Sequence, residues 1–211
     1  MGKRKIIDIQ AQKRRKNRRS IFLDDGSVFG ISEDVFFSIP VQIGDTLTDQ
    51  ELDDILVADY QQKILDFALN LLSYRMRSKV ELMHRLKRKK FNEDGIYSVM
   101  EKLETKGYID DQKFAWAFAR EKVRRKLIGP MALRSEFSVH RLDPDILEYT
   151  LKKIYGEFPE HTLMDQLLEK RRVPMNKPLD ITEKKNAVNT LRNKGFSWDR
   201  IQEILVKRGN I

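Results

Sequence analysis

The chain has 211 residues, 40% hydrophobic and 35% charged, with 41 Lys and Arg against 32 Asp and Glu. This composition can bury a core, and the basic excess favours an anionic partner, although a well-solvated helical surface would give the same balance. The absence of Cys excludes disulfides, thiolate metal sites and a cysteine nucleophile. Because no run of about 18 apolar residues occurs, we expect a cytoplasmic protein that does not enter a membrane.

Charge separates the first quarter of the chain into two segments. Residues 1–19 hold nine Lys or Arg and a single acid, which predicts a flexible basic arm. Residues 20–59 contain ten acids and no Lys or Arg, so the two segments can attract each other. Within 20–40 the pattern is typical of short strands, and Asp25-Gly26 is typical of a hairpin turn. The sequence therefore predicts a small N-terminal β-hairpin element.

From Thr48 onward the pattern is helical. Thr48 and Glu51 form a capping-box sequence, and Ser78 and Glu81 form a second, in which side chains satisfy backbone N–H groups at a helix start. Further helix starts and stops are indicated at Asn92, Gly107, Asp110, Gly129-Pro130, Asp143-Pro144 and Ser197. We therefore expect helices throughout this part of the chain.

An apolar spacing recurs three times in the helical part. Steps of 4, 5, 5 and 3 residues begin at Leu82, at Leu133 and at Ala187. A triplicated three-helix unit explains the recurrence, with chance alignment as the alternative. Such units favour a curved, elongated stack. The expected division is a basic arm (1–19), an acidic segment with short strands and a first helix (20–59), and helical repeats at 60–128, 129–172 and 173–211, the last beginning with a proline-rich linker and placed somewhat independently.

No catalytic or metal-binding pattern is found. His84, His140 and His161 are scattered without a ligand partner at helical spacing, which favours surface or packing roles. The common signatures of phosphate-binding loops and serine nucleophiles are missing. Asp110-Asp111 is better explained as a helix cap than as a metal site, because adjacent residues do not face each other on a helix. We therefore expect neither enzyme activity nor a cofactor.

Two basic runs are the candidate binding surfaces. The first has eight cations between residues 75 and 90, and we expect Tyr74, Leu82 and Leu86 to anchor its helix while the cations face phosphates or acidic groups. The second spans residues 120–126. For both, a solvated face that complements the helix dipole is the alternative. The candidate partner- or DNA-binding residues are Arg75, Arg77, Lys79, Arg85, Lys87, Arg88, Lys89, Lys90, Arg120, Arg124 and Arg125.

Four aromatic residues bear on nucleic-acid binding, because exposed rings can stack on unpaired bases. The spacing of Phe114 and Phe118 is typical of core packing, and we expect both rings to be buried, whereas we make no such prediction for Trp116. Trp198 stands at a helix start beside charged residues, where a ring can be half exposed, and the sequence leaves the exposure of both tryptophans open.

Two linked motifs resemble the RecX family. Residues 75–82 (Arg-Met-Arg-Ser-Lys-Val-Glu-Leu) match an R-x-R-S-x-x-E-L segment, and residues 107–115 (Gly-Tyr-Ile-Asp-Asp-Gln-Lys-Phe-Ala) match the glycine-containing segment that follows it in the family. Residues 185–201, with Lys194-Gly195-Phe196, are similar to the terminal repeat of the family. In the middle repeat, His140-Arg141-Leu142 stands where the family has a Lys-Gly-hydrophobic turn. The resemblance covers residues 60–211.

The resemblance implies a mainly helical protein of tandem three-helix repeats that binds the RecA recombinase filament on DNA. It implies a regulator, most simply an inhibitor, with no catalytic residues and with single- or double-stranded DNA present as part of the filament. We expect a monomer. One alternative is a free-standing DNA- or RNA-binding protein that uses its basic helix faces, with an affinity that falls steeply with salt. Another is an adaptor that holds a basic peptide.

Overall fold

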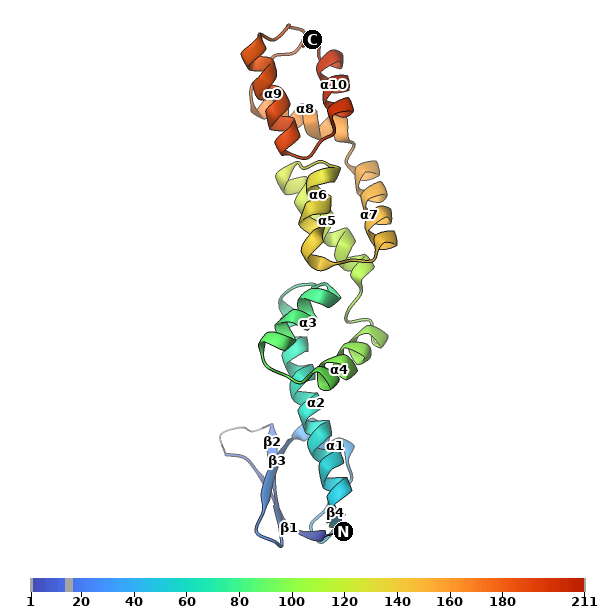
Figure 1. Ribbon diagram of the computed structural model, residues 1–211. Helices are drawn as coiled ribbons and strands as arrows, with labels where there is room; N and C mark the ends of the chain where they lie inside the picture. The colour runs from blue at the N-terminus through green and yellow to red at the C-terminus, as the bar shows by residue number, and fades with distance from the viewer. Residues whose placement is uncertain (1, 14–16, 211) are drawn as a thin grey trace. The chain divides into compact units, whose positions relative to one another are not determined.

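The computed structural model describes residues 2–13 and 17–210 (Figure 1). Within these residues the chain forms four strands and ten α-helices, which confirms the mainly helical class with an N-terminal β element. None of the described helices is long and apolar enough to cross a membrane. The chain divides into two compact units: Met1–Arg75 with Leu82–Tyr108, and Met76–Glu81 with Ile109–Ile211.

A four-stranded antiparallel sheet begins the first unit. Its strands, in the spatial order β3-β2-β1-β4, are β1 (Lys3–Ala11), β2 (Arg18–Leu23), β3 (Val28–Ser32) and β4 (Thr46–Thr48). The expected hairpin joins β2 to β3, and its Gly26 has a φ of 84°, a conformation that glycine adopts without steric strain. The sheet has four strands rather than the hairpin alone, because β1 pairs with both β2 and β4.

The N-terminal basic segment is not a free arm over its described part. In β1, Ile6 is fully buried in the core beneath the sheet. Arg4 pairs with Asp25 at 3.1 Å and with Asp49 at 3.0 Å, which is the attraction expected between the basic and acidic segments. The expectation of a flexible arm is therefore wrong for Lys3–Ala11. The part of it that concerns residues 14–16 lies outside the described residues.

Two helices follow the strands in the first unit. Residues 33–38, expected to be extended, form α1 (Glu33–Ser38), because the Ser32 hydroxyl accepts the backbone N–H of Val35 at 3.4 Å and starts the helix. α2 (Asp49–Tyr74) begins at the expected capping box, where Thr48 and Glu51 make both reciprocal hydrogen bonds. α2 contacts the sheet and also α4 (Glu93–Thr105), which follows α3 (Lys79–Arg88).

Six α-helices form most of the second unit. They are α5 (Asp111–Lys126), α6 (Pro130–Phe137), α7 (Pro144–Glu157), α8 (Glu160–Lys170), α9 (Ile181–Asn193) and α10 (Trp198–Lys207), with a short 3-10 helix at Ser138–His140. The expected starts at Asp110, Asp143 and Ser197 are confirmed, since each side chain accepts a backbone N–H at its helix. All six helices contribute to one continuous core.

The helices of this unit group differently from the boundaries expected at residues 129 and 173. α5 packs with α6 and α7, whereas α8 packs with α9 and α10. The recurring apolar spacing lies on the second and third helices of each group, such as α6 with α7 and α9 with α10. The first helix of each group lies outside that spacing. The spacing therefore could not show to which group this helix belongs.

Backbone contacts join these two groups of helices. The N–H of Gly129 donates to the Lys194 carbonyl at 2.8 Å, and the N–H of Met131 donates to the Gly195 carbonyl at 3.1 Å. Residues 173–179, expected to be a linker that frees the last repeat, are hydrogen-bonded to Arg208 and Asn210. The expected independence of the last group is therefore wrong.

Candidate partner-binding surface

Two leucines fix the orientation of α3. Leu82 and Leu86 are fully buried, and their spacing of four residues places them on one face of the helix. Arg85 and Arg88 on the same helix are exposed. Tyr74, expected to be a third anchor, is 78% exposed at the end of α2, so that expectation is wrong. The two buried leucines therefore anchor α3 through its apolar face and leave Arg85 and Arg88 on the exposed side.

Several cations of the first run have partners within the protein. Arg77 forms an ion pair with Glu81, and its side chain is only 9% exposed. The backbone N–H of Lys79 donates to Asp111 at 2.8 Å. Lys87 pairs with Glu93 at 2.6 Å, and this hydrogen bond raises the pKa of Lys87 above its ordinary value. The ion pairs of Arg77 and Lys87 reduce the charge that these two residues can offer a partner, whereas the bond from Lys79 to Asp111 involves its backbone N–H and not its ammonium group.

Four exposed cations at the end of α3 form a surface that we call the α3 basic face: Arg85, Arg88, Lys89 and Lys90. None of the four has an acidic partner among the residues that the structure describes. The ammonium group of Lys89 lies 5.7 Å from the centre of the Phe67 ring, a cation–π contact that brings no negative charge to neutralise it. Arg75, another candidate, is exposed and caps the C-terminus of α2.

The second basic run is mostly neutralised by nearby acids. Arg120 pairs with Glu157 at 2.8 Å, and Arg125 pairs with Glu121 at 3.3 Å. Lys122 and Lys126 both pair with Glu136, and their hydrogen bonds hold the pKa of that carboxyl below its ordinary value. Within the described part of the chain, only Arg124 of this run is exposed without an acidic partner. The two runs are thus alike in sequence and different in available charge.

The histidines contribute no metal site. His140 is buried, with its Nδ1 atom 2.9 Å from the Ser78 hydroxyl and its ring packed at an angle against the rings of Phe114 and Phe118. His84 and His161 are exposed. Across residues 2–13 and 17–210, no group of three or more His, Cys, Asp or Glu side chains could hold a metal ion. The expected cap is present at Asp110, where the hydrogen bond from the Lys113 N–H lowers the pKa of the carboxyl.

The aromatic residues divide between core and surface. Phe114 is buried and Phe118 packs against the core, as expected from their spacing. Trp116 is partly buried, with the ammonium group of Lys153 at 4.4 Å from its ring centre. Trp198 is 54% exposed at the start of α10, an exposure that the sequence left open. Trp198 is therefore the more accessible of the two tryptophans.

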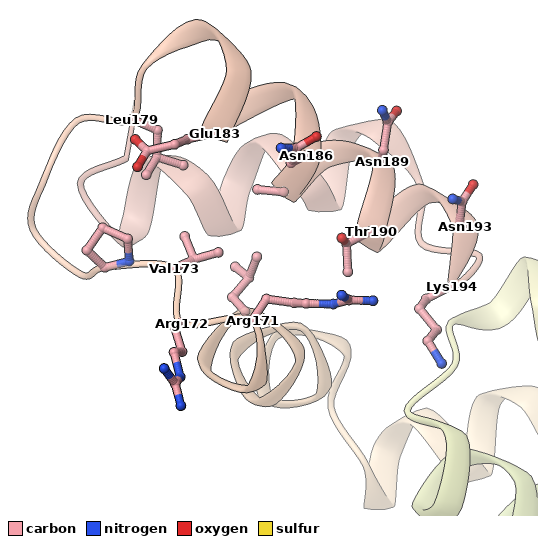
Figure 2. A pocket seen from close by; sticks show the side chains of 13 residues that line it. Arg171, Arg172, Val173, Leu179, Glu183, Asn186, Asn189, Thr190, Asn193 and Lys194 are labelled. Carbon is pink, nitrogen blue, oxygen red and sulfur yellow. The ribbon is translucent and has the colours of Figure 1, made fainter.

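A polar groove beside α9 was missed by the sequence reasoning. It lies between α8, residues 173–179 and α9, and Asn186, Asn189 and Asn193 form one of its walls (Figure 2). Their spacing of three and four residues, which places the three Asn side chains on one face of a helix, was the available signal.

Comparison with known proteins gives consistent matches. Residues 65–103 match the domain described as RecX, first three-helix domain. The regulatory protein RecX of Bacillus subtilis (strain 168) is 32% identical over 201 residues, covering 93% of this chain and 74% of that protein. A crystal structure of regulatory protein RecX matches with a TM-score of 0.75 and 27% identity, covering 95% of this chain and 98% of that one. The crystal structure of RecX from Lactobacillus salivarius matches with a TM-score of 0.61 and 26% identity, covering 71% and 97%.

Proposed function

The chain belongs to the RecX family, a family of regulatory proteins rather than enzymes, and on this premise we propose that it binds the RecA filament on DNA. In this proposal it inhibits the ATPase, strand-exchange and coprotease activities of the filament. The main support for the proposal is the exposure of the α3 basic face. Its four cations are exposed and lack acidic partners in the described structure, so acidic groups or phosphates of the filament can bind them without breaking an internal ion pair.

The remaining candidate residues are expected to contribute to binding to different extents. Arg75 extends the contact from the end of α2, and Arg124 supplies a separate contact from α5. Arg120 and Arg125 contribute less, because each would exchange its internal carboxylate for an external one. Arg77 and Lys87 mainly hold their local structure through their ion pairs, and Lys79 stays a candidate contact at the start of α3.

The test is the single-stranded-DNA-dependent ATPase activity of the cognate RecA, titrated with this protein at two salt concentrations. We expect suppression at substoichiometric ratios. The double variant Arg85→Glu/Arg88→Glu should require about tenfold more protein or more for the same effect, since tenfold corresponds to about 1.4 kcal/mol and close charge pairs at interfaces commonly exceed that value.

The matched control is Lys184→Glu/Lys185→Glu, which makes the same change of charge at two exposed residues of α9. It should suppress ATP hydrolysis like the unmodified protein, and circular dichroism should show that both variants keep their helices. Unchanged RecA activity at every ratio would refute the proposal. If the protein instead retained DNA without RecA, with an affinity that fell steeply as salt rose, the free-standing nucleic-acid binder would replace it.

A further inference from the structure

The groove beside α9 has a volume of 570 Å³ and an apolar floor (Figure 2). Leu168 and Ala187 on this floor are buried, and Val173 and Leu179 are partly buried. Binding sites for small ligands typically occupy about 300–1,000 Å³. The floor can therefore receive an apolar side chain, whose burial removes apolar surface from water.

One wall of the groove presents a row of carboxamides. Asn186, Asn189 and Asn193 are exposed on one face of α9, and Figure 2 shows them in sequence along the helix. None has a side-chain hydrogen-bond partner in the part of the chain that the structure describes. Asn is a weak helix former, so this row gives the helix little intrinsic stability. Each carboxamide offers both an acceptor and donors, which is the combination that a peptide backbone requires.

Arg171 supplies a cation to the same groove. It ends α8, and its side chain extends below the carboxamide row toward Thr190 and Lys194 (Figure 2). Arg171 is exposed and has no acidic partner among the described residues. A guanidinium group can bind a carboxylate through two parallel hydrogen bonds. Lys194, at that end, uses its ammonium group to donate to the Lys126 carbonyl at 2.9 Å.

The remaining wall is held in place by two residues near the end of the chain. Arg208, only 2% exposed, donates to the Val173 carbonyl at 3.0 Å and pairs with Asp165 at 2.8 Å. The Asn210 carboxamide donates to the carbonyls of Pro174 and Lys177, each at 2.9 Å. The groove is therefore formed before a partner arrives, which lowers the entropic cost of binding.

The lining indicates which class of partner fits. Arg171, Arg172 and Lys194 outnumber the one lining acid, Glu183, so the groove favours an anionic ligand. None of the lining residues is aromatic, and the groove thus lacks the stacking surface on which single-stranded nucleic acids are usually held. Carboxamides beside an apolar floor and the Arg171 guanidinium suit a polypeptide better than a phosphate backbone.

We propose that this groove binds an extended acidic peptide segment of a partner protein. An apolar side chain of the peptide lies on the floor, a neighbouring carboxylate pairs with Arg171, and the peptide backbone bonds to the Asn row. The site shares no residue with the α3 basic face and does not depend on RecA being the partner. It adds a second, chemically different contact surface to the protein.

The test is fluorescence anisotropy of a labelled peptide of alternating Asp and Leu, titrated with the full chain. Arg171→Glu should weaken binding about tenfold or more, which is about 1.4 kcal/mol or more, by replacing attraction with repulsion. Asn189→Trp, a change at an exposed position that fills the groove, should weaken it to a similar extent. The matched control, Lys185→Glu, reverses an exposed charge on α9 outside the groove and should bind like the unmodified protein.

Three results would overturn the proposal. An equally strong interaction with the peptide in which Asn replaces Asp would show that charge plays no part. An equal loss in Arg171→Glu and Lys185→Glu would show attraction to the protein as a whole. Absence of peptide binding, together with Arg171-dependent binding of a deoxythymidine oligomer, would assign the groove to nucleic acid. None of these readings uses RecA, so each is separate from the test of the proposed function.

Discussion

Gly195 lies at the contact between the α5–α7 and α8–α10 groups, and replacing it by Ala should destabilise the second unit. Its φ of 82° lies in the left-handed region, which favours glycine. A Cβ atom at this position would lie 2.6 Å from the Cβ of Ala132 and closer still to the backbone nitrogen of that residue. The clash is with backbone, so a simple side-chain rotation cannot relieve it.

The expected cost has two parts. The left-handed conformation costs a residue with a side chain about 1–2 kcal/mol. Moving Ala132 away disturbs the hydrogen bonds from Gly129 to Lys194 and from Met131 to Gly195, each worth about 1 kcal/mol. The substitution Gly195→Ala should therefore reduce the free energy of unfolding by about 3–4 kcal/mol.

Substitutions at two other glycines distinguish the conformational cost from the cost of the close contact. Gly107 has a φ of 72° but no atom within 4 Å of an added Cβ, so Gly107→Ala should lose only the conformational part. Gly156 lies within α7 with equally open space, and Gly156→Ala should stabilise the protein by about 0.5–1 kcal/mol through helix propensity.

Urea unfolding followed by circular dichroism measures all three variants, and tryptophan fluorescence reports the second unit, which holds Trp116 and Trp198. A loss for Gly195→Ala no larger than that for Gly107→Ala would refute the inferred close contact. A loss for Gly156→Ala would show that this glycine is needed for a contact that the structure does not contain.

Urea unfolding also tests three further predictions. Asp59 is 2% exposed and pairs with Arg18, so Asp59→Ala should cost about 3–5 kcal/mol. Burial raises the pKa of Asp59, but its hydrogen bonds outweigh burial and hold the pKa below the ordinary 3.8. The stabilisation from Asp59 is therefore present above pH 3.8 and should be lost as the pH falls through the pKa of Asp59 in the folded protein. Asp59→Asn should abolish this dependence on pH. Arg172→Gly should stabilise the protein by about 1 kcal/mol, because Arg172 has a φ of 58°, and a loss would show that its side chain has a structural contact. Leu86→Ala should cost about 2–5 kcal/mol while Tyr74→Ala changes stability by less than about 0.5 kcal/mol; similar losses would contradict their opposite burial.

Local signals in the sequence were sufficient to place many helix ends. The capping box at Thr48 and Glu51 and the N-caps at Asn92 and Asp110 depend on residues three positions apart, so they are visible in the sequence. The same holds for the anchoring of α3 by Leu82 and Leu86, whose spacing matches one helix face. These features need no knowledge of the distant chain.

Features that depend on distant partners were not predictable in this way. Lys3–Ala11 has the charge of a solvated arm, but Ile6 is buried in a sheet completed by strands that follow it by many residues. Tyr74 follows the helical period of α2 but lies where no other element covers it. The proline-rich residues 173–179 lack a regular pattern and are nevertheless ordered by Arg208 and Asn210.

The two basic runs show why charge in sequence is an incomplete guide to a binding surface. Arg120 is neutralised by Glu157, which is 37 residues away, and Lys122 by Glu136, which is 14 residues away. Neither acid falls within the run that it compensates, so counting charges in a local window overstates the second run. Arg85 and Arg88 at the end of α3, unlike Lys87 beside them, have no acidic partner in the described structure, and they therefore keep their full attraction for an anionic partner. Selective loss of function on reversing these two charges, compared with Arg120→Glu/Arg125→Glu, would follow from this difference and not from the number of cations.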